Sequence, residues 1–305
     1  LQCLLSYTKY NFMIENFQRS NYFFMLAAGA MLIGFAPIFV KWSELSSSSI
    51  LFYRMLLTLP FLIVFNLVKN KTVFFKVKSK KTILYTAIAS LAFTSDLILW
   101  HHSMNITSVS NATIIVNSAP IFVAILSIII FKEVPSRGFA LSFFITYLGI
   151  TGLIIFSSNY SNGKILGDVL CLVAAFFYGV YLLIISKLGK ETALNIIFYT
   201  TLFCCIFSIF PTLIEEGSRV PSSNSEWINL LLLAFLCQFG GQFLITIGIA
   251  NISASDGSIG LLMQPLTATM LAAVIFSEIL NITQLVFVSI TLFGIYLARI
   301  NLSRK

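Results

Sequence analysis

The chain has 305 residues, of which 58% are apolar and only 10% are charged, and its mean hydropathy is +0.95. A soluble domain carries about 25% charged residues, so this composition excludes a soluble globular protein and indicates one that lives in lipid. The formal net charge is +8, but the basic residues are dispersed among short links, which argues against a nucleic-acid partner.

Ten apolar segments are long enough to cross the bilayer, because a helix needs about 20 residues to span roughly 30 Å of hydrocarbon. In chain order they are 22–41, 48–68, 82–101, 107–131, 138–157, 165–186, 193–214, 228–249, 255–277 and 281–300. Runs such as Ile121 to Phe131 lack the apolar and polar alternation of membrane β-strands. We therefore predict an all-α integral membrane protein with ten transmembrane helices.

The residues before the first span, 1–21, are predicted to form a cytoplasmic N-terminal segment. Lys9, Glu15 and Arg19 make this segment too polar for a secretory signal. Met13 is a candidate start residue, which would place Leu1 to Phe12 outside the translated chain.

Basic residues predict the orientation, because Lys and Arg are retained on the cytoplasmic side of short links. The link after the second span is the richest in lysine, with Lys69, Lys71, Lys76, Lys78, Lys80 and Lys81. When spans are counted alternately from there, only Lys41, Lys164 and Arg219 fall on the outer side. Both termini are therefore predicted to be cytoplasmic, with 301–305 as a tail, and we expect a multi-pass protein of a bacterial inner membrane.

Four residues of the first half recur in the second half at one constant spacing. Pro120, Phe131, Glu133 and Gly149 correspond to Pro265, Phe276, Glu278 and Gly294, each 145 positions later (265 − 120 = 278 − 133 = 145). This spacing indicates an internal duplication. Each half contains five predicted helices, an odd number, so the second half enters the membrane from the opposite side. The two repeats are thus predicted to be inverted.

These motifs resemble the drug/metabolite transporter superfamily, in particular its ten-helix members with two EamA-type domains. The resembling features are Gly34 to Lys41, Arg54, Asn111 to Glu133 around Pro120, Gly167 to Tyr181, and Pro265 through Glu278. The resemblance implies a first EamA-type repeat at 22–157 and a second at 165–300, with cytoplasmic termini. It also implies transport of amino acids, other small metabolites or drugs without an ATP-binding domain, and a Walker-type glycine loop is indeed missing from the sequence.

The duplicated glutamates and prolines call for different interpretations. Glu133 and Glu278 lie at helix ends near the water interface, where capping or pairing with a nearby Lys or Arg is expected rather than contact with substrate. Pro120 and Pro265 lie inside predicted helices, where proline removes an amide and bends the helix. A packing kink would explain either proline alone, but their matched placement favours a role in the central cavity or its gates.

Ionisable residues inside the predicted spans are few and costly, so each requires a partner or water. Arg54 and Asp96 lie at similar depths below the outer surface and are expected to face the interior and to form an ion pair. A structural clamp and a functional gate or substrate contact remain open for them. Trp100 follows Asp96 on the same helical face, with His101 and His102 at the external mouth. His101 could relay protons, since imidazole titrates near neutrality, although an interfacial histidine without such a task is common.

Uncharged polar and aromatic residues on several spans form the predicted substrate site. Their amides can hydrogen-bond a zwitterion without the desolvation cost of a full charge, and their rings can cover its apolar part. This set contains Trp100, Asn117, Tyr178, Tyr181, Gln238, Gln242 and Gln264. Hydrogen bonding and packing between helices are the alternative roles. The set suits a small zwitterionic or neutral solute better than a polyanion such as a nucleotide sugar.

We therefore predict a secondary transporter for amino acids or related small metabolites that works by alternating access, either proton-coupled or driven by the solute gradient alone. No cofactor or metal is expected, because the five cysteines and two histidines lack metal-type spacing. The alternative is a polytopic membrane enzyme acting on a lipid or small metabolite, but paired carboxylates or an activated nucleophile are missing. A channel is disfavoured by two inverted halves in one chain.

The expected partners are a small-molecule substrate and the lipid bilayer, and Gly149 and Gly294 could serve packing within a monomer or contact within a homodimer.

Overall fold

The structure is a computed structural model that describes residues 21–77, 79–131, 137–156, 162–186, 188, 192–216, 220–251, 261, 263–278 and 280–303. Within these ranges the chain is helical and contains no strand. The helices are 21–34, α2 (Ala36–Trp42), α3 (Ser47–Asn70), α4 (Lys80–Ser103), α5 (Val109–Val116), α6 (Ala119–Phe131), α7 (Arg137–Ile155), α8 (Asn162–Ser186), α9 (Ala193–Glu216), α10 (Asn224–Leu232), the π-helix η1 (Leu233–Gly241), α11 (Gln242–Asn251), α13 (Met263–Phe276) and α14 (Ile282–Ser303).

Seven helical stretches of the described chain are long and apolar enough to cross a membrane. They are Asn21–Trp42, Ser47–Asn70, Lys80–Ser103, Val109–Ile130, Lys164–Ile185, Ala193–Glu215 and Asn224–Ile245. The protein is therefore a multi-pass, all-helical membrane protein. The other segments predicted to span, 138–157, 255–277 and 281–300, contain α7, α13 and α14, and their spanning stays a prediction.

Three of these stretches are interrupted near the middle of the molecule. The first breaks at Phe35, because Pro37 in the first turn of α2 has no amide to continue the ladder. The stretch from Val109 breaks at 117–118, just before Pro120, as the proline predicted. The third changes from α to π over η1, a local widening that is frequent at functional sites.

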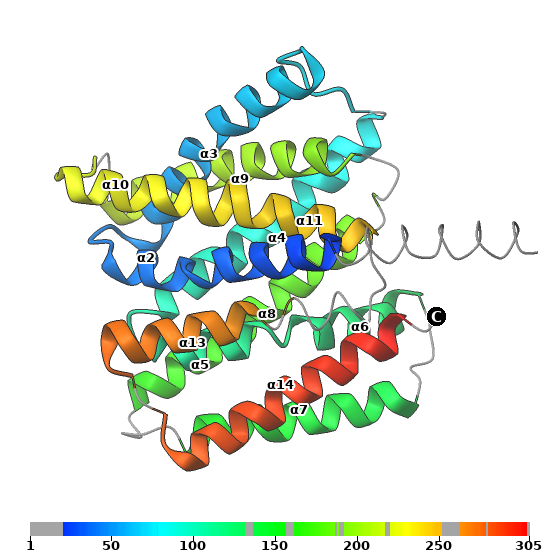
Figure 1. The fold of residues 1–305 in the computed structure, drawn as a ribbon, viewed down its shortest axis with the longest axis vertical. Helices are drawn as coiled ribbons and strands as arrows, with labels where there is room; N and C mark the ends of the chain where they lie inside the picture. The colour runs from blue at the N-terminus through cyan, green and yellow to red at the C-terminus, as the bar shows by residue number, and fades with distance from the viewer. Residues whose placement is uncertain are drawn as a thin grey trace, which may run out of the picture.

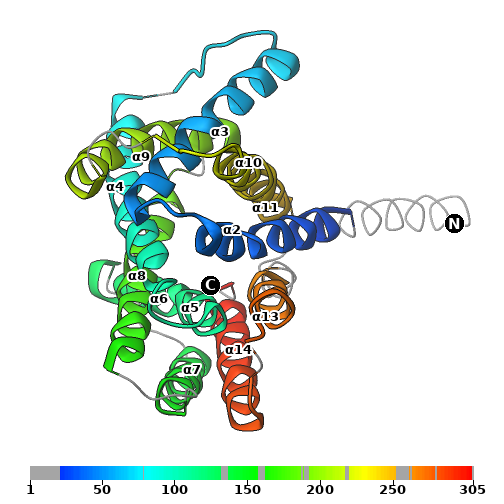
Figure 2. The ribbon, with the colours of Figure 1, turned by 90° about the vertical axis from the view of Figure 1, so that its left-hand side faces the viewer.

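The helices lie side by side, and the links 43–46 and 104–108 meet at one end of the bundle (Figure 1). In the view of Figure 2, α3, α9 and α4 lie above α8, while α7 and α14 form a pair at the bottom. The largest buried apolar cluster joins residues of α3, α4, α5 and α8, including Leu51, Phe93, Ile115 and Ala174. This cluster surrounds the polar residues considered below.

Glycines bring pairs of helices into contact at matched positions of the two halves. A Cβ atom on Gly149 of α7 would lie 2.4 Å from Thr291 Oγ1, and one on Gly294 of α14 would lie 2.4 Å from Thr146 Oγ1. Each threonine and each glycine of one contact stands 145 positions from its counterpart in the other (291 − 146 = 294 − 149). These two glycines therefore serve packing inside the chain, which answers the choice that the sequence left open.

A second matched pair lies nearer the centre of the bundle. A Cβ atom on Gly34 would meet Thr267 Cβ at 2.7 Å and the Gln264 carbonyl oxygen at 3.0 Å. A Cβ atom on Gly179 would meet Phe122 Cβ at 2.8 Å and the Ala119 carbonyl oxygen at 3.2 Å, and all three positions are again 145 apart. The helix 21–34 thus packs on α13 as α8 packs on α6.

Candidate functional site

Arg54 lies in the first third of α3, a helix whose start is well defined. The Ser46 side chain caps α3 by accepting from the Ser49 amide, so Arg54 falls two turns into the helix. Only 4% of Arg54 is exposed, and its Nε donates to Gln238 Oε1 at 3.0 Å. Thr58, one turn later, donates to the Arg54 and Ala234 carbonyl oxygens at 2.7 and 3.3 Å. Two polar contacts therefore join α3 to the π-helix.

Asp96 on α4 is also buried, with 3% of its surface exposed. It interacts electrostatically with Arg54, but the two side chains do not form the direct ion pair that the sequence predicted. Arg54 instead uses Nε to bind Gln238, while Arg54 Nη1 and Asp96 Oδ1 are buried without a hydrogen-bond partner among the described residues. The hydrogen bond to Gln238 on η1 is a long-range contact that spacing in the sequence does not reveal.

His101 is fully buried, which corrects its predicted place at the external mouth. Its Nδ1 lies 3.1 Å from the Ser47 carbonyl oxygen, and because a carbonyl only accepts, Nδ1 is the donor. His101 Nε2 and Trp100 Nε1 have no hydrogen-bond partner among the described residues. The start of α3 packs over the end of α4 and covers His101, whereas His102 is exposed.

Aromatic rings from α4 and α8 form one wall beside Asp96. Phe93 and Tyr181 stack with centroids 4.5 Å apart at 18°, and Tyr178 stacks on Tyr181 at 5.9 Å. Tyr181 is buried and interacts electrostatically with Asp96. The structure thus brings Tyr178 and Tyr181 into the neighbourhood of the charged residues.

The other predicted substrate residues are spread over further helices. Asn117 ends α5, and its Nδ2 donates to the Thr113 carbonyl oxygen at 2.8 Å, so this amide serves its own helix. Gln242 begins α11, one turn after Gln238, and is half-buried. Gln264 is half-buried in α13 beside Pro265, where its carbonyl oxygen faces Gly34.

A second buried carboxylate, Asp168 of α8, was not singled out from the sequence. It accepts from the Thr107 hydroxyl at 2.6 Å and from Asn111 Nδ2 at 3.3 Å, and thereby joins α8 to the start of α5. The sequence signal that could have identified Asp168 is a carboxylic acid in the first turns of an otherwise apolar span. Among the described residues no group of His, Cys, Asp and Glu is arranged to hold a metal.

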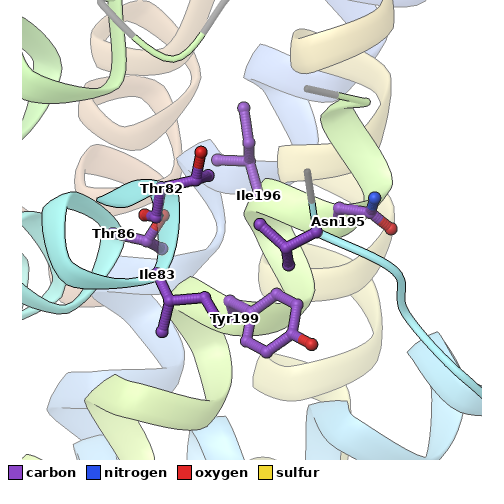
Figure 3. A pocket seen from close by; sticks show the side chains of 7 residues that line it. Thr82, Ile83, Thr86, Asn195, Ile196 and Tyr199 are labelled. Atoms are coloured by element: carbon purple, nitrogen blue, oxygen red, sulfur yellow. The ribbon is translucent and has the colours of Figure 1, made fainter. Parts of the chain in front are cut away.

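A small pocket lies away from these residues, between α4, α9 and the link 71–79 (Figure 3). Thr82, Thr86, Asn195 and Tyr199 are among its lining residues. Asn195 and Tyr199 also hold the link by donating to the Lys76 and Phe75 carbonyl oxygens at 2.7 and 2.8 Å. The volume of the pocket, about 10 Å³, suits a single water molecule, so we assign no substrate to this pocket.

Apolar helices long enough to span, packed around a few buried polar residues, define a multi-pass membrane protein, and the comparison with known proteins gives its class. The model of the EamA-like transporter family matches residues 20–155 and 165–300, two tandem regions that begin 145 positions apart (165 − 20). The chain belongs to the EamA-like transporter family. The drug/metabolite transporter resemblance with two EamA domains is thereby confirmed.

Proteins of similar sequence agree with this assignment. An "Uncharacterized transporter" of Archaeoglobus fulgidus is 25% identical over 281 residues, covering 90% of this chain and 96% of that protein. "Solute carrier family 35 member G1" of Mus musculus is 29% identical over 243 residues, covering 73% of this chain and 63% of that protein. A solved structure, titled "Crystal structure of protein", has a TM-score of 0.68 at 12% identity and covers 94% of this chain and 99% of its own, so it shows the fold alone.

Proposed function

We propose that the protein is a secondary transporter of amino acids or related small metabolites, a carrier rather than an enzyme, that works by alternating access. The reciprocal contacts of Gly149 with Thr291 and of Gly294 with Thr146 carry the alternating-access part of this proposal. Gly149 meets Thr291, and the counterpart of Thr291 in the first half, Thr146, meets the counterpart of Gly149 in the second half, Gly294. Two segments whose contacts are exchanged in this way are related by a two-fold axis. Inverted repeats with this symmetry are the recurrent architecture of carriers that open alternately to the two sides.

In this proposal ten helices span the membrane as two inverted repeats, 22–157 and 165–300. An odd number of five helices per repeat requires the inversion, and the lysines of the link 69–81 put both termini in the cytoplasm. The end of the bundle with links 43–46 and 104–108 is then the outer end. We place the protein in a bacterial inner membrane.

The transport site is proposed around Arg54 and Asp96, with Gln238 and the Tyr178 and Tyr181 wall as contacts for the solute. An unpartnered polar atom inside a membrane protein costs free energy, so Arg54 Nη1 and Asp96 Oδ1 favour a polar ligand or water between them. A cation and an anion at one site suit a zwitterion, with the aromatic wall beside its apolar part.

The remaining predicted residues receive supporting roles in this mechanism. Trp100, Asn117, Gln242 and Gln264 extend the substrate path, and Pro120 and Pro265 shape the helices that line it. Asp96 or His101 takes up a proton if transport is coupled, and a carrier driven by the solute gradient alone is the alternative.

Counterflow in proteoliposomes tests the proposal directly. Vesicles containing the purified protein are loaded with a pooled panel of unlabelled amino acids and small metabolites, and entry of each labelled solute is followed with and without a pH gradient. We expect saturable exchange of one solute class. No exchange across the panel, in protein that elutes as a single folded species, would refute the function, and stimulation by the gradient would establish proton coupling.

A further inference from the structure

The first turn of α5 is bound by a carboxylate from the far end of the chain. The amides of Val109 and Ser110 donate to Glu278 Oε1 and Oε2 at 3.2 and 3.4 Å. The first amides of a helix have no partner within it, and a negative charge there is favourable. Glu278 therefore caps a helix that begins 169 residues earlier.

The turn after α13 and the side chain of Lys41 hold Glu278 in this position. Ser277 adopts a left-handed conformation with φ 55°, which reverses the chain after α13, and the Glu278 amide donates to the Ala272 carbonyl oxygen at 3.3 Å. Lys41 Nζ lies 3.0 Å from Glu278 Oε1 and 4.9 Å from the centre of the Phe276 ring. The end of α2 and the end of α13 thus form one charged cluster, with the carboxylate directed at α5.

The helices around this cluster fall into two groups that are each joined internally. Gly34 packs the helix 21–34 against α13, and Lys41 adds an ion pair between α2 and Glu278. Gly179 packs α8 against α6, and Asp168 joins α8 to α5. The bonds from Val109 and Ser110 to Glu278 cross between the two groups.

We propose that Glu278 is the latch of the outer gate, released when the group of 21–34, α2 and α13 moves away from the group of α5, α6 and α8. This inference rests on the proposed alternating-access function. Opening breaks the two bonds to the α5 amides and leaves the Lys41 pair, the glycine contacts and the Asp168 bonds intact. Among the described residues these two are the hydrogen bonds that cross between the groups, whereas the rest of the contact between α13 and α5 is apolar packing, which also parts on opening.

Spin-label distance measurements test the latch without any ligand. Cysteines replace Trp42 at the end of α2 and Asn105 in the link that leads into α5; both residues are exposed, and they report on the group of α2 and on the start of the group of α5. Cys171, Cys204, Cys205 and Cys237 are buried and do not compete for the label, and Cys3 is replaced by serine. Double electron–electron resonance in nanodiscs then reports the shares of short and long distances between the two groups.

Two independent changes weaken the latch. Glu278→Gln keeps the size of the side chain and removes its charge. Val109→Pro removes one donor from the opposite side, and proline is tolerated there because Val109 is the first residue of α5 and Ser108 is already extended, with ψ 149°. We expect each variant to raise the ratio of long to short distances roughly three- to tenfold, because a charge-assisted hydrogen bond is lost from one state only.

Glu215→Gln is the matched control. Glu215 also lies at the outer end and accepts from the Ser48 hydroxyl at 2.5 Å, but it joins α9 to α3, outside the two groups. Unchanged distances in both latch variants, or an equal change in Glu215→Gln, would overturn the latch. Counterflow on the same preparations separates the two proposals: unchanged distances in an active carrier refute the latch alone, and a wild-type protein without exchange refutes the carrier.

Discussion

Replacing Gly149 with alanine is expected to force α7 and α14 apart. The added Cβ would lie 2.4 Å from Thr291 Oγ1, 2.7 Å from the Thr291 nitrogen and 2.9 Å from its Cα. Two of these atoms belong to the backbone, so a change of rotamer cannot relieve the overlap. Overpacking of this kind costs about 1–3 kcal/mol, and the helix propensity of alanine recovers up to about 1 kcal/mol of it. Because the overlap involves backbone atoms, the cost falls in the upper part of that range, about 2–3 kcal/mol, and we expect a net loss of about 1–2 kcal/mol.

The reciprocal geometry makes this prediction unusually specific. A Cβ on Gly294 would meet Thr146 Oγ1, nitrogen and Cα at 2.4, 2.6 and 2.9 Å, so Gly294→Ala should lose as much stability as Gly149→Ala. The double variant should lose less than the sum, because both glycines hold the same pair of helices. Thr291→Ala should not rescue Gly149→Ala, since the backbone overlap remains.

Thermal unfolding of the detergent-solubilised protein, followed by tryptophan fluorescence, measures these effects. Gly240→Ala is the control, because its Cβ would meet nothing closer than the Phe235 carbonyl oxygen at 3.2 Å. The Tm of the control should stay close to that of the wild type, while both α7–α14 variants fall by several degrees. Equal stability of Gly149→Ala and wild type, or clearly unequal losses in the two reciprocal variants, would refute the two-fold contact.

Three further variants probe the polar centre. Gln238→Leu leaves the buried Nε of Arg54 without its acceptor and should cost about 1–3 kcal/mol in thermal unfolding, whereas Gln238→Glu, which retains an acceptor, should lose less. Asp96→Asn should abolish counterflow if Asp96 contacts the solute or a coupled proton, and full transport with a lowered Tm would establish a structural clamp with Arg54 instead. Cys204 and Cys237, which are fully buried, should resist a membrane-impermeant maleimide in intact vesicles, and rapid labelling of either would contradict the packing of α3, α9 and η1.

Local patterns in the sequence were sufficient for the broad class of this protein. Apolar length reflects the thickness of the hydrocarbon core, so helices occur in every predicted segment for which residues are described. The break before Pro120 follows from the missing amide of a single residue. The capping role expected for Glu278 is also seen, although the amides that it accepts from belong to another helix, α5.

The partners of individual polar residues could not be predicted in this way. Arg54 and Asp96 have the burial and depth that their positions suggested, yet Gln238 binds the guanidinium, 184 residues away in the chain. His101 is covered by the start of α3, although its place near a helix end suggested an exposed site. The lysine that pairs with Glu278 is Lys41 from the first stretch of helix rather than a neighbour in sequence.

The sequence by itself determined that this chain is an apolar, duplicated membrane protein of the EamA type, because hydropathy, a constant spacing of 145 positions and family motifs are properties of residue order. Only the tertiary structure decided which glycine meets which threonine, which amide holds Arg54 and which helix Glu278 caps. Inside a membrane protein every apolar surface is acceptable to lipid, so hydropathy does not specify which helices are neighbours. Close backbone approach and a few long-range hydrogen bonds specify the neighbours, and these exist only once the helices are assembled.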